Sequence, residues 1–95
     1  MRKISTVELR HLEVINLCGG ERLGSPCELE IDLDCGQIIS LVIPIDCGFS
    51  LLGKKEEYVI PWCKIECIGE DAILVKIPRD ELSRCECYKN RKRPR

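Results

Sequence analysis

The chain has 95 residues and a formal net charge of −1 at pH 7, which suits a single domain with one hydrophobic core. Its longest apolar run, residues 41–45, is far shorter than the ~20 residues of a membrane-spanning helix, and residues 1–6 lack the apolar stretch of a secretory signal. We therefore expect a cytoplasmic protein without a membrane span.

The first elements predicted along the chain are a helical turn and a strand. Ser5 and Glu8 have the spacing of a capping box, so a short helix is expected over about residues 6–10. Residues 12–17 follow as a strand, and the glycine pair after it indicates a turn.

Residues 27–34 carry the clearest strand signal, because apolar and acidic residues alternate along them. The apolar set is Cys27, Leu29, Ile31 and Leu33, and the acidic set is Glu28, Glu30, Asp32 and Asp34. This period of two predicts a strand with its apolar face buried and its acidic face in solvent. Side chains on one strand face lie too far apart to form a shared Ca²⁺ cage.

The next predicted strands are residues 38–43, residues 58–62 and a hairpin over 66–77. The first of these is apolar on both faces, which favours a central position in the sheet, and Pro44 is expected to end it. Pro61 favours a sheet edge or a bulge near the end of the second.

These elements predict a mainly β fold. We expect a small antiparallel barrel of five to six strands, with short helical turns, over residues 1–77. Residues 78–95 are expected to form a C-terminal extension, with a short helix over 80–88 and then a disordered basic tail.

The C-terminal extension concentrates positive charge. Residues 78–95 hold 7 Lys and Arg against 3 Asp and Glu, whereas residues 1–77 hold 8 against 13. The last seven residues contain five cations: Lys89, Arg91, Lys92, Arg93 and Arg95. Such a cluster attracts nucleic acid or an anionic membrane surface without sequence preference. A solubilising tail that binds nothing is the alternative.

The eight cysteines are expected to be reduced thiols, as is usual in the cytoplasm. A thiolate zinc site would draw on Cys63, Cys67, Cys85 and Cys87. Their CxxxC and CxC spacings differ from the CxxC knuckles of zinc ribbons. We therefore favour a protein without a metal or another cofactor, and keep a thiol- or zinc-responsive module as an alternative.

With its motifs placed on strands, the chain resembles a PRC-barrel domain, and among such domains the small sporulation proteins of the YlmC/YmxH family in endospore-forming Firmicutes. The matching segments are Glu13–Asn16, Glu21–Gly24, Glu28–Asp32, Gly36, Tyr58–Trp62, Ile65, Ile68–Asp71 and Ile73–Val75. The resemblance covers about residues 4–77. It implies a cytosolic binding module, often dimeric and linked to sporulation, with no established catalytic activity.

We accordingly predict a non-catalytic adaptor that binds a protein partner and forms a homodimer. The expected contact is either the sheet edge near Pro61 or an apolar group in the connection over residues 45–57, namely Phe49, Leu51 and Leu52. No catalytic residue is proposed, because His11 has no evident partner in the sequence. A module that binds RNA or the ribosome through the basic tail is the other alternative.

Overall fold

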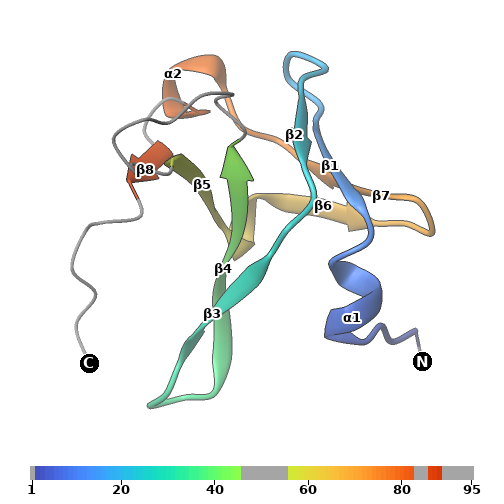
Figure 1. The fold of residues 1–95 in the computed structure, drawn as a ribbon, viewed down its shortest axis with the longest axis vertical. Coiled ribbons are helices and arrows are strands. Elements are labelled where there is room, and N and C mark those ends of the chain that lie inside the picture. The colour runs from blue at the N-terminus through green and yellow to red at the C-terminus, as the bar shows by residue number, and fades with distance from the viewer. Residues whose placement is uncertain (1, 46–55, 83–85, 89–95) are drawn as a thin grey trace.

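The computed structural model describes residues 2–45, 56–82 and 86–88, which form two four-stranded sheets with short helices beside them (Figure 1). The strand order is β2-β1-β7-β6 in one sheet and β3-β4-β5-β8 in the other. In chain order the elements are α1 (Thr6–Leu9), β1 (Glu13–Asn16), β2 (Arg22–Gly24), β3 (Glu28–Asp32), β4 (Gln37–Ile45), β5 (Glu56–Pro61), the 3₁₀ turn η1 (Trp62–Lys64), β6 (Ile65–Ile68), β7 (Ala72–Val75), α2 (Arg79–Leu82) and β8 (Glu86–Tyr88).

The predicted barrel of five to six antiparallel strands is wrong in strand number, pairing and closure. The described residues contain eight strands in two sheets and do not form one closed barrel. β1 and β7 are parallel, with residues 13–16 opposite residues 72–75. Parallel neighbours need a long connection, and here most of the fold lies between the two strands. Apolar alternation locates a strand but does not identify its partner, so the sequence could not show this pairing.

Several local predictions are confirmed. α1 follows a complete capping box, in which Ser5 Oγ accepts from the Glu8 N–H at 3.1 Å and Glu8 Oε1 accepts from the Ser5 N–H at 3.3 Å. The predicted hairpin is β6–β7, whose turn is closed by the Gly69 N–H donating to the Ala72 carbonyl at 2.8 Å. β4 is central, between β3 and β5, although it continues through Pro44 to Ile45.

The β3–β4 hairpin departs from the predicted alternation beyond Leu29. Glu30 lies opposite Ser40 and Ile31 lies opposite Ile38, so Ile39 is an extra residue on β4. Such a bulge turns the strand and increases its twist, and the hairpin projects beyond the body in Figure 1. Ile31 is consequently 52% exposed, and Leu33 at the tip is 93% exposed. The acidic face, which was expected to lie in solvent, is also partly covered, because Glu30 is half-buried and accepts a hydrogen bond from Ser40 Oγ.

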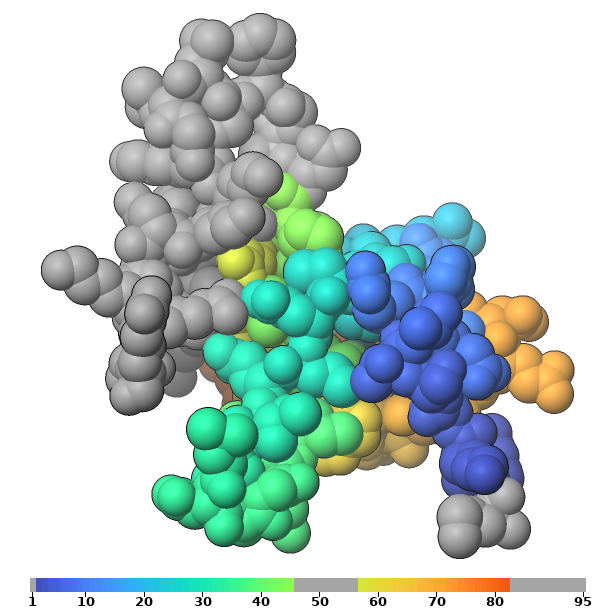
Figure 2. Space-filling model, turned by 60° about the horizontal axis from the view of Figure 1, so that its bottom comes forward, coloured from blue at the N-terminus to red at the C-terminus, as the bar shows by residue number. Residues whose placement is uncertain are grey.

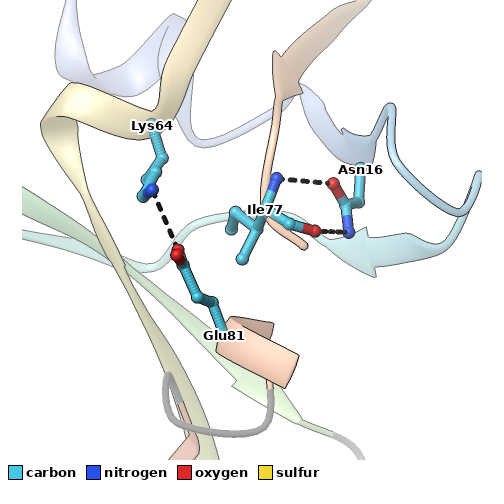
Figure 3. A network of polar contacts seen from close by, with 4 residues as sticks. All are labelled: Asn16, Lys64, Ile77 and Glu81. Atoms are coloured by element: carbon cyan, nitrogen blue, oxygen red, sulfur yellow. Dashed lines mark hydrogen bonds and ion pairs between the residues drawn. The ribbon is translucent and has the colours of Figure 1, made fainter. Parts of the chain in front are cut away.

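The chain after β7 also differs from the prediction. Of the helix expected over 80–88, the described residues contain α2 (Arg79–Leu82), and residues 86–88 instead form β8, which pairs antiparallel with β5. Leu82 is 9% exposed and belongs to the core, and Lys64 Nζ lies 2.9 Å from Glu81 Oε2 (Figure 3). The hydrophobic core therefore includes a residue beyond Pro78. Residues 89–95, the predicted basic tail, lie outside the described residues.

One core joins the two sheets and both helices. Its buried members are Leu9, Leu12, Val14, Leu23, Leu41, Ile43, Ile60, Ile73, Val75, Ile77 and Leu82. Tyr58 and Trp62 are partly buried and pack against this core. Each α-helix in the described residues has four residues, and no helix there is long and apolar enough to cross a membrane.

A buried side-chain amide extends the parallel pairing of β1 and β7 (Figure 3). Asn16 Nδ2 donates to the Ile77 carbonyl at 2.9 Å, and Asn16 Oδ1 accepts from the Ile77 N–H at 3.0 Å. The Leu17 N–H donates to the Val75 carbonyl at 2.8 Å just beside this contact. Asn16 thus supplies both backbone groups of Ile77 with partners in a place where water cannot reach them.

The two sheets approach each other closely at Gly24 in β2. Its φ is +104°, and a Cβ at this position would lie 3.3 Å from Ile43 Cγ2 on β4. Gly36, in the β3–β4 turn, also has a positive φ, of +74°, but a Cβ there would meet nothing within 4 Å.

We expect Asn16→Ala to lower the free energy of unfolding by more than a typical surface substitution. Each backbone group of Ile77 left unpaired should cost about 1–3 kcal/mol. Urea unfolding followed by circular dichroism would measure the change, with the exposed Gln37→Ala as control. A midpoint for Asn16→Ala that equals that of the control would contradict this role.

We also expect Gly24→Ala to destabilise the fold more than Gly36→Ala. Both substitutions place a side chain at a positive φ, which costs about 1–3 kcal/mol, but only the first also brings a Cβ within 3.3 Å of Ile43 Cγ2, a tight contact. The difference in melting temperature between the two variants would measure the cost of the contact with Ile43, because both variants carry the cost of the positive φ. Equal melting temperatures would show that the two sheets can separate at this point without loss.

Candidate functional site

An open groove of about 1300 Å³ lies between the N-terminal segment and β6. In Figure 2 the N-terminal residues, in dark blue, project from the body at the lower right. The apolar lining residues are Ile4, Leu12, Trp62, Ile65 and Ile68. The charged ones are Arg2, Lys3, Glu8, Glu66, Glu70 and Asp71, and His11, Cys67 and Gly69 complete the lining. The groove thus combines an apolar floor with a charged rim.

β6 forms one side of this groove and is the last strand of its sheet. Its pairing with β7 shifts register between Ile65 and Cys67, so Glu66 is an extra residue. Ile65 and Ile68 are half-buried against the core, whereas Glu66 and Cys67 are both exposed. The bulge therefore presents two successive side chains to solvent and leaves apolar side chains on either side of them.

The N-terminal segment reaches across the groove to the edge of β6. Arg2 Nη2 donates to the Ile68 carbonyl oxygen at 3.2 Å, a contact between residues 66 positions apart. The capping box then turns the chain into α1, whose Leu9 is buried in the core. One wall of the groove is therefore anchored at α1 and touches the opposite wall through a single exposed arginine.

Two ionisable side chains of the groove are engaged with α1 itself. Glu8 completes the capping box, and His11 Nδ1 lies 2.7 Å from the Val7 carbonyl oxygen. Because a carbonyl oxygen only accepts, the His11 ring donates through Nδ1. The exposed carboxylates of Glu66, Glu70 and Asp71 are on the side of β6 and its turn. The arrangement is suited to holding a ligand with both apolar and cationic groups.

The structure places the other predicted sites as follows. Phe49, Leu51 and Leu52 lie outside the described residues, as do the cations of the basic tail. Of the four cysteines considered for zinc, Cys63 on η1 and Cys67 on β6 are free and exposed. Cys85 is outside the described residues, and Cys87 belongs to β8 in the other sheet. The described residues contain no group of three or more His, Cys, Asp or Glu side chains that could hold a metal ion.

Sequence reasoning missed the groove. Trp62, Ile65 and Ile68 line the groove and also pack against the core, and nothing in their spacing marks them as groove residues. The signal that was overlooked is the basic pair Arg2 and Lys3 ahead of the capping box. No spacing in the chain connects that pair with β6, which lies more than sixty positions away.

The thiols differ in their surroundings. Partial burial, together with the negative charges of Glu28 and Glu57, raises the pKa of Cys27 above its ordinary value. In the β3–β4 turn, the Asp34 N–H and then the Cys35 thiol stabilise the carboxylate of Asp32 and lower its pKa. Neither residue lines the groove.

The architecture and the sequence together define the class of protein. The PRC-barrel domain family matches residues 1–82, and the chain belongs to this family. It is 39% identical over 77 residues to the probable sporulation protein YlmC of Bacillus subtilis, a match that covers 78% of this chain and 93% of YlmC. It is 35% identical over 75 residues to the uncharacterized protein YmxH of the same organism, covering 77% of this chain and 88% of YmxH. An uncharacterized protein of Clostridium acetobutylicum is 33% identical over 67 residues, which are 70% of this chain and 77% of that protein.

We expect Cys27 to react slowly with iodoacetamide at pH 8 in the folded protein. The reactive species is the thiolate, and a raised pKa lowers the thiolate fraction at any pH below it. Brief alkylation of folded and urea-unfolded protein, followed by peptide mass spectrometry, would measure the ratio of rates at this cysteine. Glu28→Gln removes a nearby negative charge, so the alkylation rates of Cys27 in the folded and unfolded protein should become more similar. Equal rates in the folded and unfolded wild type would contradict a raised pKa of Cys27.

Proposed function

We propose that this protein is a non-catalytic adaptor that binds a partner protein through the groove beside β6, and that it acts in sporulation. The observation that carries the proposal is the groove itself. It places half-buried apolar side chains and exposed charges beside a sheet edge, as protein-binding surfaces do. The link to sporulation is supported by the similarity to the probable sporulation protein YlmC.

The side chains of the groove are suited to binding. Glu8 completes the capping box and His11 donates through Nδ1 to the Val7 carbonyl, so both side chains help to hold α1 in place. Trp62, Ile65 and Ile68 offer apolar surface without leaving the core exposed. A ligand would gain affinity by covering this surface while its polar groups meet the rim.

The proposal places the protein in the cytoplasm. The five cysteines assigned as free in the described residues are all exposed, and exposed unpaired thiols fit a reducing compartment. The predicted homodimer belongs to the same proposal, and light scattering of the purified protein would give its mass in solution.

The test is affinity capture from cells entering sporulation, with the full chain as bait. We expect a partner protein to bind the wild type and to be lost with Glu66→Lys, because the substitution reverses a charge on the groove rim. Asp34→Lys makes the same change at the β3–β4 turn, which does not line the groove and lies at the projecting end of that hairpin in Figure 1, and should retain the partner. Loss with both variants, or with neither, would contradict binding through the groove.

Two further arms address function and the alternatives. A strain carrying Glu66→Lys should form fewer spores than one carrying Asp34→Lys, and equal spore counts would contradict the role in sporulation. Capture that survives Glu66→Lys but is abolished by nuclease, or by removing residues 89–95, would favour the RNA-binding alternative. Metal analysis of protein purified without added zinc tests the thiol alternative, and about one equivalent of bound zinc would favour it.

A further inference from the structure

We propose that the groove receives an extended segment of the partner as an added strand on the free edge of β6, with a main-chain N–H of that segment replacing Arg2 at the Ile68 carbonyl and its basic side chains facing Glu66, Glu70 and Asp71. This inference rests on the proposed function, since it specifies how the same groove binds. It assigns the partner's chemistry: a strand in which basic residues alternate with apolar ones.

The backbone of β6 is available on its outer side for pairing with an added strand. In the part of the chain that the structure describes, β6 pairs with β7 on one side and with no strand on the other. The Ile68 carbonyl points to that outer side, because it accepts its hydrogen bond from Arg2 across the groove. An exposed strand edge of this kind is a template for strand addition, in which main-chain hydrogen bonds provide affinity.

Arg2 occupies the position on the β6 edge that an added strand would take. Its guanidinium meets the β6 edge where a neighbouring strand would donate an N–H. The contact is 3.2 Å long and exposed, so it contributes little to stability and can be exchanged for another donor. Arg2 also lines the groove together with Glu66, Glu70 and Asp71. A cation at this carbonyl is therefore already compatible with the surrounding charge.

Side chains set the rest of the preference. Ile65 and Ile68 are half-buried on β6, and Trp62 lies just before them on η1, so apolar residues of an added strand have surface to cover. Glu66, Glu70 and Asp71 are exposed beside them and favour cations. The same carboxylates argue against a second copy of this chain pairing through β6, because like charges would face each other across the new strand pair.

The test uses the full chain and a synthetic probe, the peptide acetyl-(Lys-Val)₄-amide, titrated at low salt and followed by NMR. We expect the backbone amide signals of β6 to shift on addition of the peptide. The largest chemical-shift changes should be those of Ile68 and Gly69. Acetyl-(Glu-Val)₄-amide, matched in length and strand propensity, should bind much more weakly. A Lys-Val peptide N-methylated at alternate residues along one edge should also fail, because it keeps the charge but loses the main-chain donors on that edge.

Two variants make the mode of binding falsifiable. Arg2→Ala should bind the Lys-Val peptide about threefold more tightly, because the resident donor no longer competes. Glu66→Lys with Glu70→Lys should weaken binding about fivefold, and both sites are exposed, so the fold should be retained. Shifts confined to β3 or β8, equal binding of the N-methylated peptide, or weaker binding by Arg2→Ala would overturn the proposal.

The experiments distinguish a failure of this strand-addition inference from a failure of the proposed function. If the captured partner depends on Glu66 but Arg2→Ala weakens its binding, the groove binds the partner by another mode and only this inference fails. If no partner depends on the groove, the proposed function fails, whatever the peptide does.

Discussion

The parallel pairing of β1 with β7 is the constraint on which the rest of the structure depends. It joins the start of the chain to its last strand before α2, and the Asn16 amide carries the pairing to Ile77 after both strands end. Because β7 is also the hairpin partner of β6, this pairing brings the N-terminal segment to the side of β6. The groove is thus a consequence of topology: one wall comes from the first residues of the chain and the other from residues near position 68.

The edges of the two sheets are protected in different ways. β3 carries alternating carboxylates and a bulged partner strand, both of which hinder pairing with another chain. β6 also contains a bulge, but in the described residues its outer side is met by the exposed Arg2 and not by a strand. The hydrogen bond from Arg2 is exposed, so water or another donor can replace it at the Ile68 carbonyl at little cost in free energy. The contrast explains why the proposed binding is assigned to β6.

Membership of the PRC-barrel domain family identifies the scaffold, and the similarity to YlmC identifies a relative named as a probable sporulation protein. They do not define a ligand, because one fold carries different functions on different surfaces. In this chain the surface chemistry is specific: an apolar floor from η1 and β6, carboxylates beside it, and an N-terminal arginine across it. Binding selectivity should follow from these residues rather than from the β-sheets that support them.

The sequence by itself determined the local elements of this protein. The capping box at Ser5 and Glu8, the β6–β7 hairpin around Gly69 and the central apolar strand β4 depend on contacts between near neighbours, which spacing and residue type reveal. The family resemblance could also be recognised from those motifs in their order. Tertiary structure alone decided the parallel β1–β7 pair, the exposure of Ile31 and Leu33, and the meeting of Arg2 with Ile68. Each of these depends on how distant segments pack or on where a hairpin extends beyond the core. The local pattern of apolar and polar residues reveals neither.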